Sequence, residues 1–164
     1  AWLSILEASF IVFLLKPHYK NFNKRLVKTP KLYFYDTGIV SSLLGIASEE
    51  QIATHHLKGN LFETLVISEL FKYRFNRGES APFYFWRDKA GHEIDCIAEL
   101  NNALIPIEIK SGKTITDDFF SDMRYWQGLS SAKTSFLIYG GDETQKRSAT
   151  TVLGWKRIDD VFSK

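Results

Sequence analysis

The chain has 164 residues, of which 45% are hydrophobic and 24% are charged, and its formal net charge is +2. This length can bury one hydrophobic core without disulfides or structural metals, and so small a net charge does not by itself require a nucleic-acid partner. The single cysteine, Cys96, excludes a disulfide within the chain, and no uncharged apolar run of about 18 residues is present to span a bilayer. We therefore expect a cytoplasmic protein without a membrane partner.

The first 31 residues combine a helical pattern with a basic segment. Residues 2–10 already show helical apolar spacing, which predicts that a longer chain precedes them. Residues 16–31 carry only basic charges, interleaved with aromatic side chains, and such a composition suits contacts to phosphates and bases. The alternative is a solvated ribbon between a helix and a strand. The residues predicted to bind nucleic acid are Lys16, Lys20, Lys24, Arg25 and Lys28.

Two helices and a short strand are expected between residues 32 and 77. The apolar run 32–35 predicts a strand, Asp36 is a suitable N-cap for a helix over 37–44, and Gly45 is suited to end that helix. Residues 60–77 predict a second, mostly apolar helix that includes Glu63. Asn60-x-x-Glu63 is close to a capping box, in which Glu63 would serve only as a helix cap.

Three strands are expected at 82–87, 92–99 and 103–110, and the last two form a hairpin. Asparagine tolerates the positive φ of a two-residue turn, so Asn101-Asn102 is the expected loop, although a three-residue loop would change the pairing. With this loop, the numbers of two directly opposed residues in the two strands sum to 203. The hairpin would place one apolar face against the core, and on the other face Asp95 opposite Glu108 and Glu93 opposite Lys110.

Two opposed carboxylates repel each other, which makes the Asp95–Glu108 pair a candidate metal site. Hard oxygen ligands, with water and phosphate in the remaining positions, suit Mg²⁺ or Mn²⁺. Lys110, two residues beyond Glu108, could orient a water molecule or neutralise charge on a phosphate. The alternative is the ordinary solvated face of an antiparallel sheet, where charged residues are common.

The remaining elements are a helix over 117–129 and a strand over 134–139. Gln127 on this helix and Arg87 at the end of the expected strand 82–87 are accessory candidates. The Ser111-Gly112-Lys113-Thr114 segment resembles the end of a phosphate-binding loop, but that loop requires an earlier glycine where this chain has Ile107. No ATP site is therefore expected in this fragment.

Larger stretches of the sequence carry a family resemblance. The pattern Asp95 … Glu108-Ile109-Lys110 resembles the D…(D/E)XK signature of the PD-(D/E)XK nuclease superfamily, and the order of expected elements is similar to the αβββαβ core of restriction-endonuclease-like folds. The stretches KTPKLYFYDTG, GNLFETLVISEL and IPIEIKSGKT resemble a domain of unknown function found at the C-terminus of prokaryotic AAA-type ATPases.

This resemblance implies an α/β fold with a mixed sheet flanked by helices and a basic N-terminal extension. Residues 1–58 would be the tail of a winged-helix-like segment with a linking helix, and residues 59–164 the nuclease-like domain. Asp95, Glu108 and the Ile109 carbonyl would hold the metal, while Glu63 would extend the acidic site.

Three functions are compatible with this sequence. The first is Mg²⁺-dependent phosphodiester hydrolysis of DNA by the C-terminal module of an AAA-type ATPase. The second is a docking module for DNA or protein that keeps the nuclease fold without cleaving. The third is a self-association domain, in which exposed aromatic residues such as Trp155 would form an oligomer interface.

Overall fold

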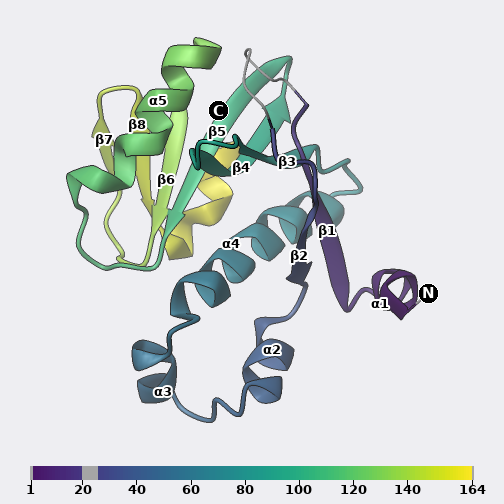
Figure 1. Cartoon of the computed structure of the whole chain (residues 1–164). Helices are drawn as coiled ribbons and strands as arrows, with labels where there is room; N and C mark the ends of the chain where they lie inside the picture. Colours follow the sequence, from purple (N-terminus) through teal and green to yellow (C-terminus); the bar gives the residue numbers. More distant parts are fainter. Residues whose placement is uncertain (1, 20–25, 164) are drawn as a thin grey trace.

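The structure, a computed structural model, describes residues 2–19 and 26–163. Within these residues eight strands form one mixed sheet in the order β2-β1-β3-β4-β5-β6-β8-β7 (Figure 1). The pairs β1–β3, β5–β6 and β6–β8 are parallel, and the others are antiparallel. The strands are β1 (Val12–Pro17), β2 (Lys31–Phe34), β3 (Phe83–Arg87), β4 (Glu93–Leu100), β5 (Ala103–Lys110), β6 (Ser135–Tyr139), β7 (Gln145–Arg147) and β8 (Thr150–Gly154).

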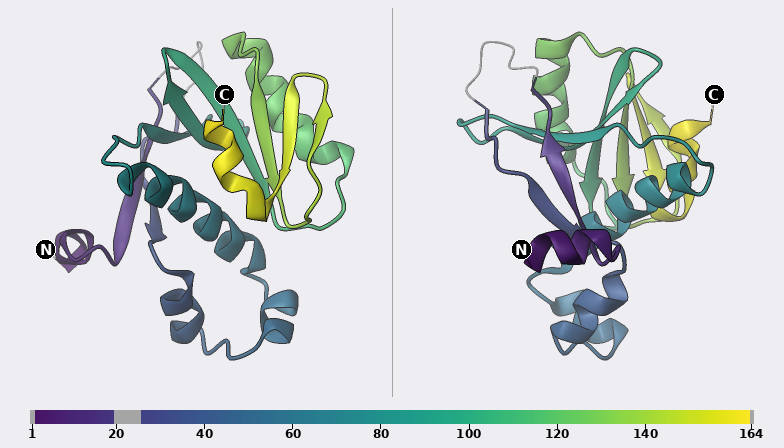
Figure 2. Two further views of the ribbon diagram at one scale, coloured as in Figure 1. Left: turned by 180° about the vertical axis from the view of Figure 1, so that it is seen from behind. Right: turned by 90° about the vertical axis from the view of Figure 1, so that its right-hand side faces the viewer.

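Helices cover both faces of the sheet, which confirms the expected mixed α/β class (Figure 2). The helix α4 and the 3₁₀ segment η2 pack on one face with Cys96 and Ile107, and α5 packs on the other face with Ile97. None of the described helices is long and apolar enough to cross a membrane. The helical elements are α1 (Trp2–Ala8), α2 (Thr37–Leu43), α3 (Glu49–Thr54), α4 (Lys58–Phe75), η1 (Asp117–Phe120), α5 (Ser121–Ser130) and η2 (Trp155–Phe162).

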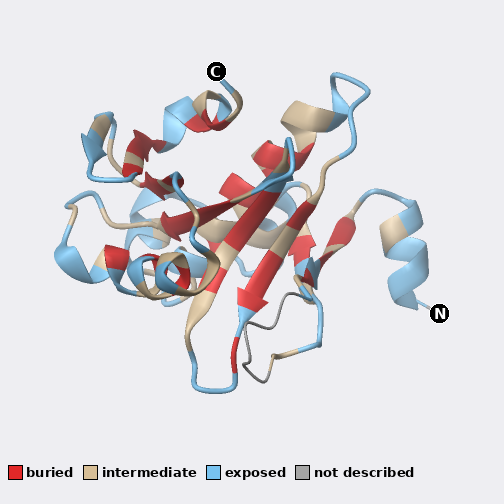
Figure 3. Cartoon of the chain, turned by 90° about the horizontal axis from the view of Figure 1, so that it is seen from above, coloured by how far each residue is buried: buried red, intermediate tan, exposed pale blue. Residues whose placement is uncertain are grey.

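The buried residues are concentrated in the central strands and in the helix surfaces against them (Figure 3). The expected helices over 37–44, 60–77 and 117–129 correspond to α2, α4 and η1 with α5, within about two residues. Asp36 caps α2 by accepting a hydrogen bond from the Gly38 N–H at 2.7 Å, and Gly45 adopts φ +70° beyond its end, as expected.

The N-terminal segment contributes strands that its helical spacing does not indicate. Residues 2–8 form α1, but β1 follows and pairs with both β2 and β3, so these strands lie in the same sheet as the hairpin. Phe13 of β1 contacts the rings of Tyr33, Tyr35 and Phe71 and is buried. Continuous apolar runs do not distinguish a buried strand from a helix by periodicity alone, and here the aromatic contacts across the core favour the strand.

The hairpin of β4 and β5 has the predicted turn and register. Asn101 and Asn102 take φ angles of +50° and +61°, as a two-residue turn of this kind requires. Paired residue numbers sum to 203 along the ladder from Leu100–Ala103 to Cys96–Ile107. Cys96 and Ile107 are fully buried on the face that α4 covers.

A β-bulge interrupts β4 next to the candidate site. Phe85 of β3 faces both Asp95 and Cys96 of β4, so β4 has one extra residue here. The bulge breaks the strict alternation of side chains. As a result Ile94, which strict alternation would place on the same face as Cys96, packs with Ile97 against α5.

The predicted continuation of the hairpin pairing beyond Cys96 is therefore wrong. The ladder between β4 and β5 does not extend to Asp95–Glu108 or Glu93–Lys110. Glu93 pairs with Arg87 of β3. The polar side chains of the candidate site lie just beyond the last pair of this ladder, Cys96–Ile107.

Candidate active site

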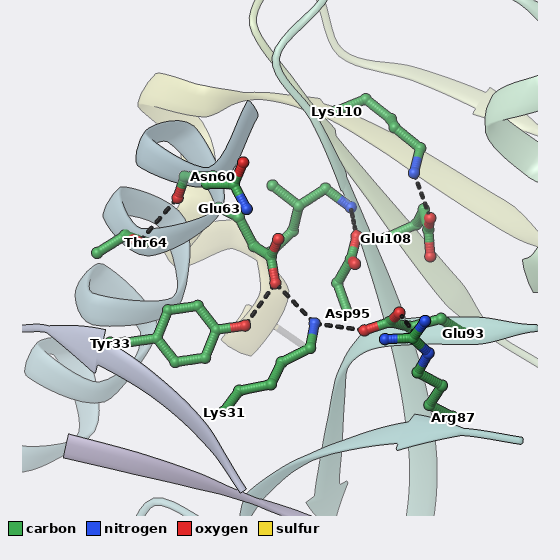
Figure 4. A network of polar contacts seen from close by, with 11 residues as sticks. Lys31, Tyr33, Asn60, Glu63, Thr64, Arg87, Glu93, Asp95, Glu108 and Lys110 are labelled. Carbon is green, nitrogen blue, oxygen red and sulfur yellow. Dashed lines mark hydrogen bonds and ion pairs between the residues drawn. The ribbon is translucent and has the colours of Figure 1, made fainter. Parts of the chain in front are cut away.

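Asp95 and Glu108 lie side by side just beyond the end of the β4–β5 ladder (Figure 4). The backbone N–H of Ile109 donates a hydrogen bond of 2.8 Å to Oδ2 of Asp95. This side-chain contact takes the place of a ladder bond between the two strands. Asp95 is thus held beside Glu108 by the backbone of β5 rather than by direct cross-strand pairing.

Glu108 is the most deeply buried carboxylate of the site, with 3% of its surface exposed. Its Oε1 accepts a hydrogen bond of 2.5 Å from Nζ of Lys110, whereas its buried Oε2 has no hydrogen-bond partner among the described residues. Burial and the neighbouring charge of Asp95 raise the pKa of Glu108 well above its usual value, and Lys110 opposes this only in part.

Asp95 experiences the same physical effects. Burial and the charge of Glu63 raise the pKa of Asp95, the ammonium groups of Lys110 and Lys31 oppose both effects, and the resulting pKa is about 7. Burial alone would lower the pKa of Lys110, but Glu108 and Asp95 outweigh it and raise that pKa. Lys110 is therefore an ammonium ion at neutral pH, able to donate hydrogen bonds but not to accept a proton.

Glu63 of α4 faces this group from the side of the helix. The capping-box interpretation of Glu63 is wrong, because α4 begins two residues before Asn60 and Leu57 occupies the N-cap position. Instead, Oε1 of Glu63 accepts hydrogen bonds from the Tyr33 hydroxyl and from Nζ of Lys31, the latter at 3.0 Å. Glu63 thereby connects α4 to β2.

Lys31 bridges two carboxylates that come from different elements. Its Nζ forms ion pairs with Glu63 of α4 and with Glu93 of β4. Burial by itself lowers the pKa of Lys31, but the carboxylates of Glu63, Glu93 and Asp95 raise it to about 12. Arg87 adds a weaker contact, with its Nε 3.5 Å from Oε2 of Glu93, so this accessory candidate lies at the edge of the site.

Other predicted residues lie away from this cluster or outside the described residues. Gln127 donates a hydrogen bond of 3.0 Å to the Ser135 hydroxyl at the start of β6, whereas Glu108 lies beside Leu137 farther along that strand. Lys16 and Lys28 are exposed. The remaining predicted nucleic-acid-binding residues, Lys20, Lys24 and Arg25, fall outside the described residues.

Sequence reasoning missed four contributors to the site. Lys31 was grouped with the basic segment and Tyr33 with an apolar strand, although their spacing of two residues places both on one face of β2. On the α5 side, Nδ1 of His92 lies 2.9 Å from Oδ1 of Asp122, whose charge also raises the pKa of Glu108. No local pattern links His92 to a helix 30 residues away.

The carboxylates do not form a ready multidentate metal cage. Among residues 2–19 and 26–163, no group of three His, Cys, Asp or Glu side chains is arranged to hold a metal ion. The oxygen donors present nevertheless suit Mg²⁺, which commonly uses one or two carboxylates and takes its other ligands from water and phosphate. The candidate donors are Asp95 and the unpartnered Oε2 of Glu108, and the Ile109 carbonyl stays the third predicted donor.

Residues 58–158 match the model of a protein family described as a domain of unknown function, DUF4143. The chain belongs to this family. The DUF4143 match begins with α4 and extends into η2, so it includes the four residues predicted to be catalytic, Glu63, Asp95, Glu108 and Lys110. Residues 1–50 match a second domain of unknown function, DUF8612.

Two curated relatives of this DUF4143 chain are uncharacterized proteins of Mycobacterium bovis and Mycobacterium tuberculosis. Each is 30% identical to this chain over 123 residues, which make up 75% of this chain and 26% of the relative. The chain thus spans about a quarter of the length of these relatives. The expected membership in a domain family of unknown function is confirmed, while the ATPase context and the nuclease resemblance stay predictions.

The bridge formed by Lys31 predicts a measurable coupling between β2 and α4. We expect Lys31→Gln to lower the free energy of unfolding by about 1–2 kcal/mol, because it leaves the partly buried Glu63 without a cation and leaves Glu93 with only its weaker contact to Arg87. The double variant Lys31→Gln/Glu63→Gln should lose less free energy of unfolding than the two single variants lose together. Urea unfolding at pH 7 would measure these losses. Lys72→Gln, which breaks a half-exposed ion pair with Glu69, is the control and should cost under about 0.5 kcal/mol. If the stability losses of the two single variants simply add, Lys31 and Glu63 are not coupled and the proposed bridge is contradicted.

Proposed function

We propose that this chain is a Mg²⁺-dependent nuclease module that acts on DNA and that, in longer proteins, follows an AAA-type ATPase module. The observation that carries the proposal is the buried Oε2 of Glu108, which lacks a partner while Lys110 occupies Oε1 and Asp95 lies alongside. Leaving a buried carboxylate oxygen unsatisfied costs free energy. A divalent cation would offset that cost and the repulsion between the two carboxylates.

The order of elements supports the nuclease part of this proposal. α4 is followed by β3, β4 and β5, then by α5 and β6. This order agrees with the αβββαβ core of restriction-endonuclease-like folds. The bulge in β4 also suits a functional site, since bulges are over-represented beside active sites, where they redirect a side chain.

Asp95, Glu108 and the Ile109 carbonyl would hold the ion. When bound, Mg²⁺ or Mn²⁺ supplies positive charge that polarises a phosphodiester and makes water easier to deprotonate. Lys110 would donate a hydrogen bond that orients the attacking water, or would neutralise charge that develops on the phosphate. About one third of its side chain is exposed, so the ammonium group can reach a substrate. Glu63, with Lys31 and Tyr33 on its carboxylate, would hold the acidic side of the site in place.

The contacts that would hold DNA lie outside the carboxylate cluster. Lys16, in β1, and Lys28, between β1 and β2, are exposed and belong to the basic segment 16–31. Exposed lysines contribute attraction to the phosphate backbone without reading its sequence. The ATPase context is supported by the resemblance and by relatives that are about three times as long as this chain.

Metal-dependent cleavage by the 164-residue chain tests the proposal. Wild-type protein should nick supercoiled DNA in Mg²⁺ or Mn²⁺, and Glu108→Gln should reduce the rate by roughly a hundredfold or more, because it removes one carboxylate donor. Glu99→Gln changes an exposed carboxylate of the neighbouring strand β4 and is the matched control. Equal activity of Glu108→Gln, Glu99→Gln and wild type would contradict the assignment of Glu108.

A docking module without cleavage is the second candidate function, and the exposed apolar surface of α1 favours it. α1 buries none of its residues, and its Trp2 side chain is 82% exposed. Exposed apolar surface of this kind commonly marks a protein–protein contact. Loss of all metal-dependent cleavage, together with retained binding of DNA or of the ATPase module, would favour docking.

A further inference from the structure

A pocket of about 260 Å³ lies next to the carboxylate cluster but is distinct from it. It is formed where the C-terminal ends of the parallel strands β5, β6 and β8 meet the first half of α4. In open α/β sheets, the crevice outside the carboxyl ends of parallel strands is the usual place for ligands. Neither the family descriptions nor the predicted catalytic residues assign this pocket a role.

The walls of the pocket are apolar and aromatic. Leu61, Phe62 and Leu65 of α4 form one side, and Trp155, at the junction of β8 and η2, contributes an exposed indole. An apolar surface with an aromatic ring at its edge favours a flat, weakly hydrated ligand such as an aromatic ring. The volume lies just under the range of about 300–1,000 Å³ that holds drug-sized ligands, so one ring system fits and a peptide helix does not.

The charge of the pocket lining is entirely positive. Lys58 of α4 and Lys113 after β5 line it, and its lining includes no aspartate or glutamate. Neither ammonium group forms an ion pair with any other residue in the described ranges. Lysines without an ion-pair partner, beside an apolar pocket that suits an aromatic ring, complement a ligand that carries both an aromatic ring and an anionic group.

The pocket adjoins the candidate active site on two elements. Ser111, which lines the pocket, follows Lys110 directly, and Phe62 directly precedes Glu63 on α4. A strand of nucleic acid with one phosphate at the carboxylate cluster would therefore have neighbouring nucleotides within reach of the pocket. The segment Ser111–Lys113 resembles the end of an ATP-binding loop in sequence. It would contact the nucleic-acid strand rather than ATP.

We propose that this pocket receives one unpaired nucleobase of a single-stranded nucleic acid, with the adjacent phosphates contacting Lys58 and Lys113. The proposal rests on the nuclease function proposed above and names its substrate as a strand with at least one unstacked base. Phe62 and Trp155 supply the stacking surface, which accepts any base because every base presents an aromatic face. The lysines supply attraction that weakens with salt.

Binding of a fluorescently labelled short oligothymidylate, measured by anisotropy in EDTA and low salt, tests this assignment without chemistry. Trp155→Ala should weaken binding by roughly fivefold or more, and Lys113→Gln should weaken it and reduce its salt dependence. Trp2→Ala and Lys133→Gln, changes of exposed residues elsewhere, are the matched controls and should change the affinity by less than about twofold. Wild-type affinity in Trp155→Ala would overturn the proposal, and so would an absence of oligothymidylate binding by the wild type.

A second measurement keeps the test decisive even if Trp155→Ala fails to fold. The same sugar–phosphate chain without bases should bind wild-type protein roughly fivefold more weakly, and Lys113→Gln should weaken both oligomers. Equal affinity of the base-free chain would overturn the proposal. It would also be overturned if a peptide of aspartates around one phenylalanine bound in a Trp155-dependent way while oligothymidylate did not, since the occupant would then be a protein.

The two proposals fail separately. Trp155-dependent binding in EDTA, without any cleavage in Mg²⁺, supports the base pocket and rejects the hydrolysis. If cleavage depends on Glu108 but binding depends neither on the bases nor on Trp155, the base-pocket proposal is rejected. The hydrolysis proposal is unaffected by that result.

Discussion

Replacing Lys110 by alanine should reduce metal-dependent DNA cleavage by roughly a hundredfold or more while leaving metal affinity within a few-fold of wild type. Lys110 contacts Glu108 through Oε1 only, so its removal leaves both carboxylates and the unpartnered Oε2 in place. What is lost is the ammonium group that would orient water or neutralise the phosphate. Plasmid nicking measures the rate, and calorimetric titration with Mn²⁺ measures the affinity.

Two comparisons distinguish this outcome from a general loss of structure or from contamination. Lys133→Ala removes an exposed lysine remote from the cluster in sequence and should cleave like wild type. Ca²⁺ should bind without supporting cleavage. If wild type and Lys110→Ala show the same trace of cleavage, that activity is a contaminant, and the docking module becomes the favoured function.

Without metal, the free energy of unfolding of the wild type should decrease as the pH rises from about 4 to about 7. The decrease should be smaller in Asp95→Asn. The folded chain raises the pKa of Asp95 from 3.8 to about 7, chiefly through burial and the charge of Glu63. Between these values the folded state holds a proton that the unfolded state has released, so the stabilisation present below about pH 4 is lost as pH approaches 7. At pH 8 we expect Asp95→Asn to be more stable than wild type by about 0.5–1 kcal/mol, with the two equal near pH 4.

Asparagine is a suitable replacement because its amide oxygen can still accept the hydrogen bond from the Ile109 N–H. Mg²⁺ should then raise the melting temperature of wild type at pH 8, since only a ligand bound preferentially to the native state stabilises it. At a concentration of about 100 times Kd the gain would be about 2.7 kcal/mol, or roughly 5–10 °C for a chain of this length. The melting temperature of Asp95→Asn should rise little when Mg²⁺ is added.

The opposite result has an equally clear meaning. If Asp95→Asn lowers the melting temperature at pH 8 and wild type is indifferent to millimolar Mg²⁺ and Mn²⁺, Asp95 serves as a structural acceptor for the backbone of β5. The carboxylate cluster would then be a hydrogen-bonded support for the sheet, and the docking function would be preferred.

The elements that the sequence predicted by itself are those governed by local chemistry. Asn101 and Asn102 tolerate positive φ, and together with alternating apolar residues they determined the hairpin register as far as Cys96–Ile107. Asp36 and Gly45 marked the ends of α2 through capping and backbone freedom. Each of these signals involves residues close together in the chain, so no tertiary information was needed.

What only the tertiary structure decided depends on contacts between distant segments. The bulge at Asp95 arises from pairing with β3, and it replaced the expected carboxylate pair with a side-chain bond to the Ile109 backbone. Lys31 reaches Glu63 across 32 residues, and Gln127, whose helix was predicted correctly, turns to Ser135. Periodicity specifies which face of an element is apolar, but partner strands and packing select the neighbour that each polar side chain on that element meets.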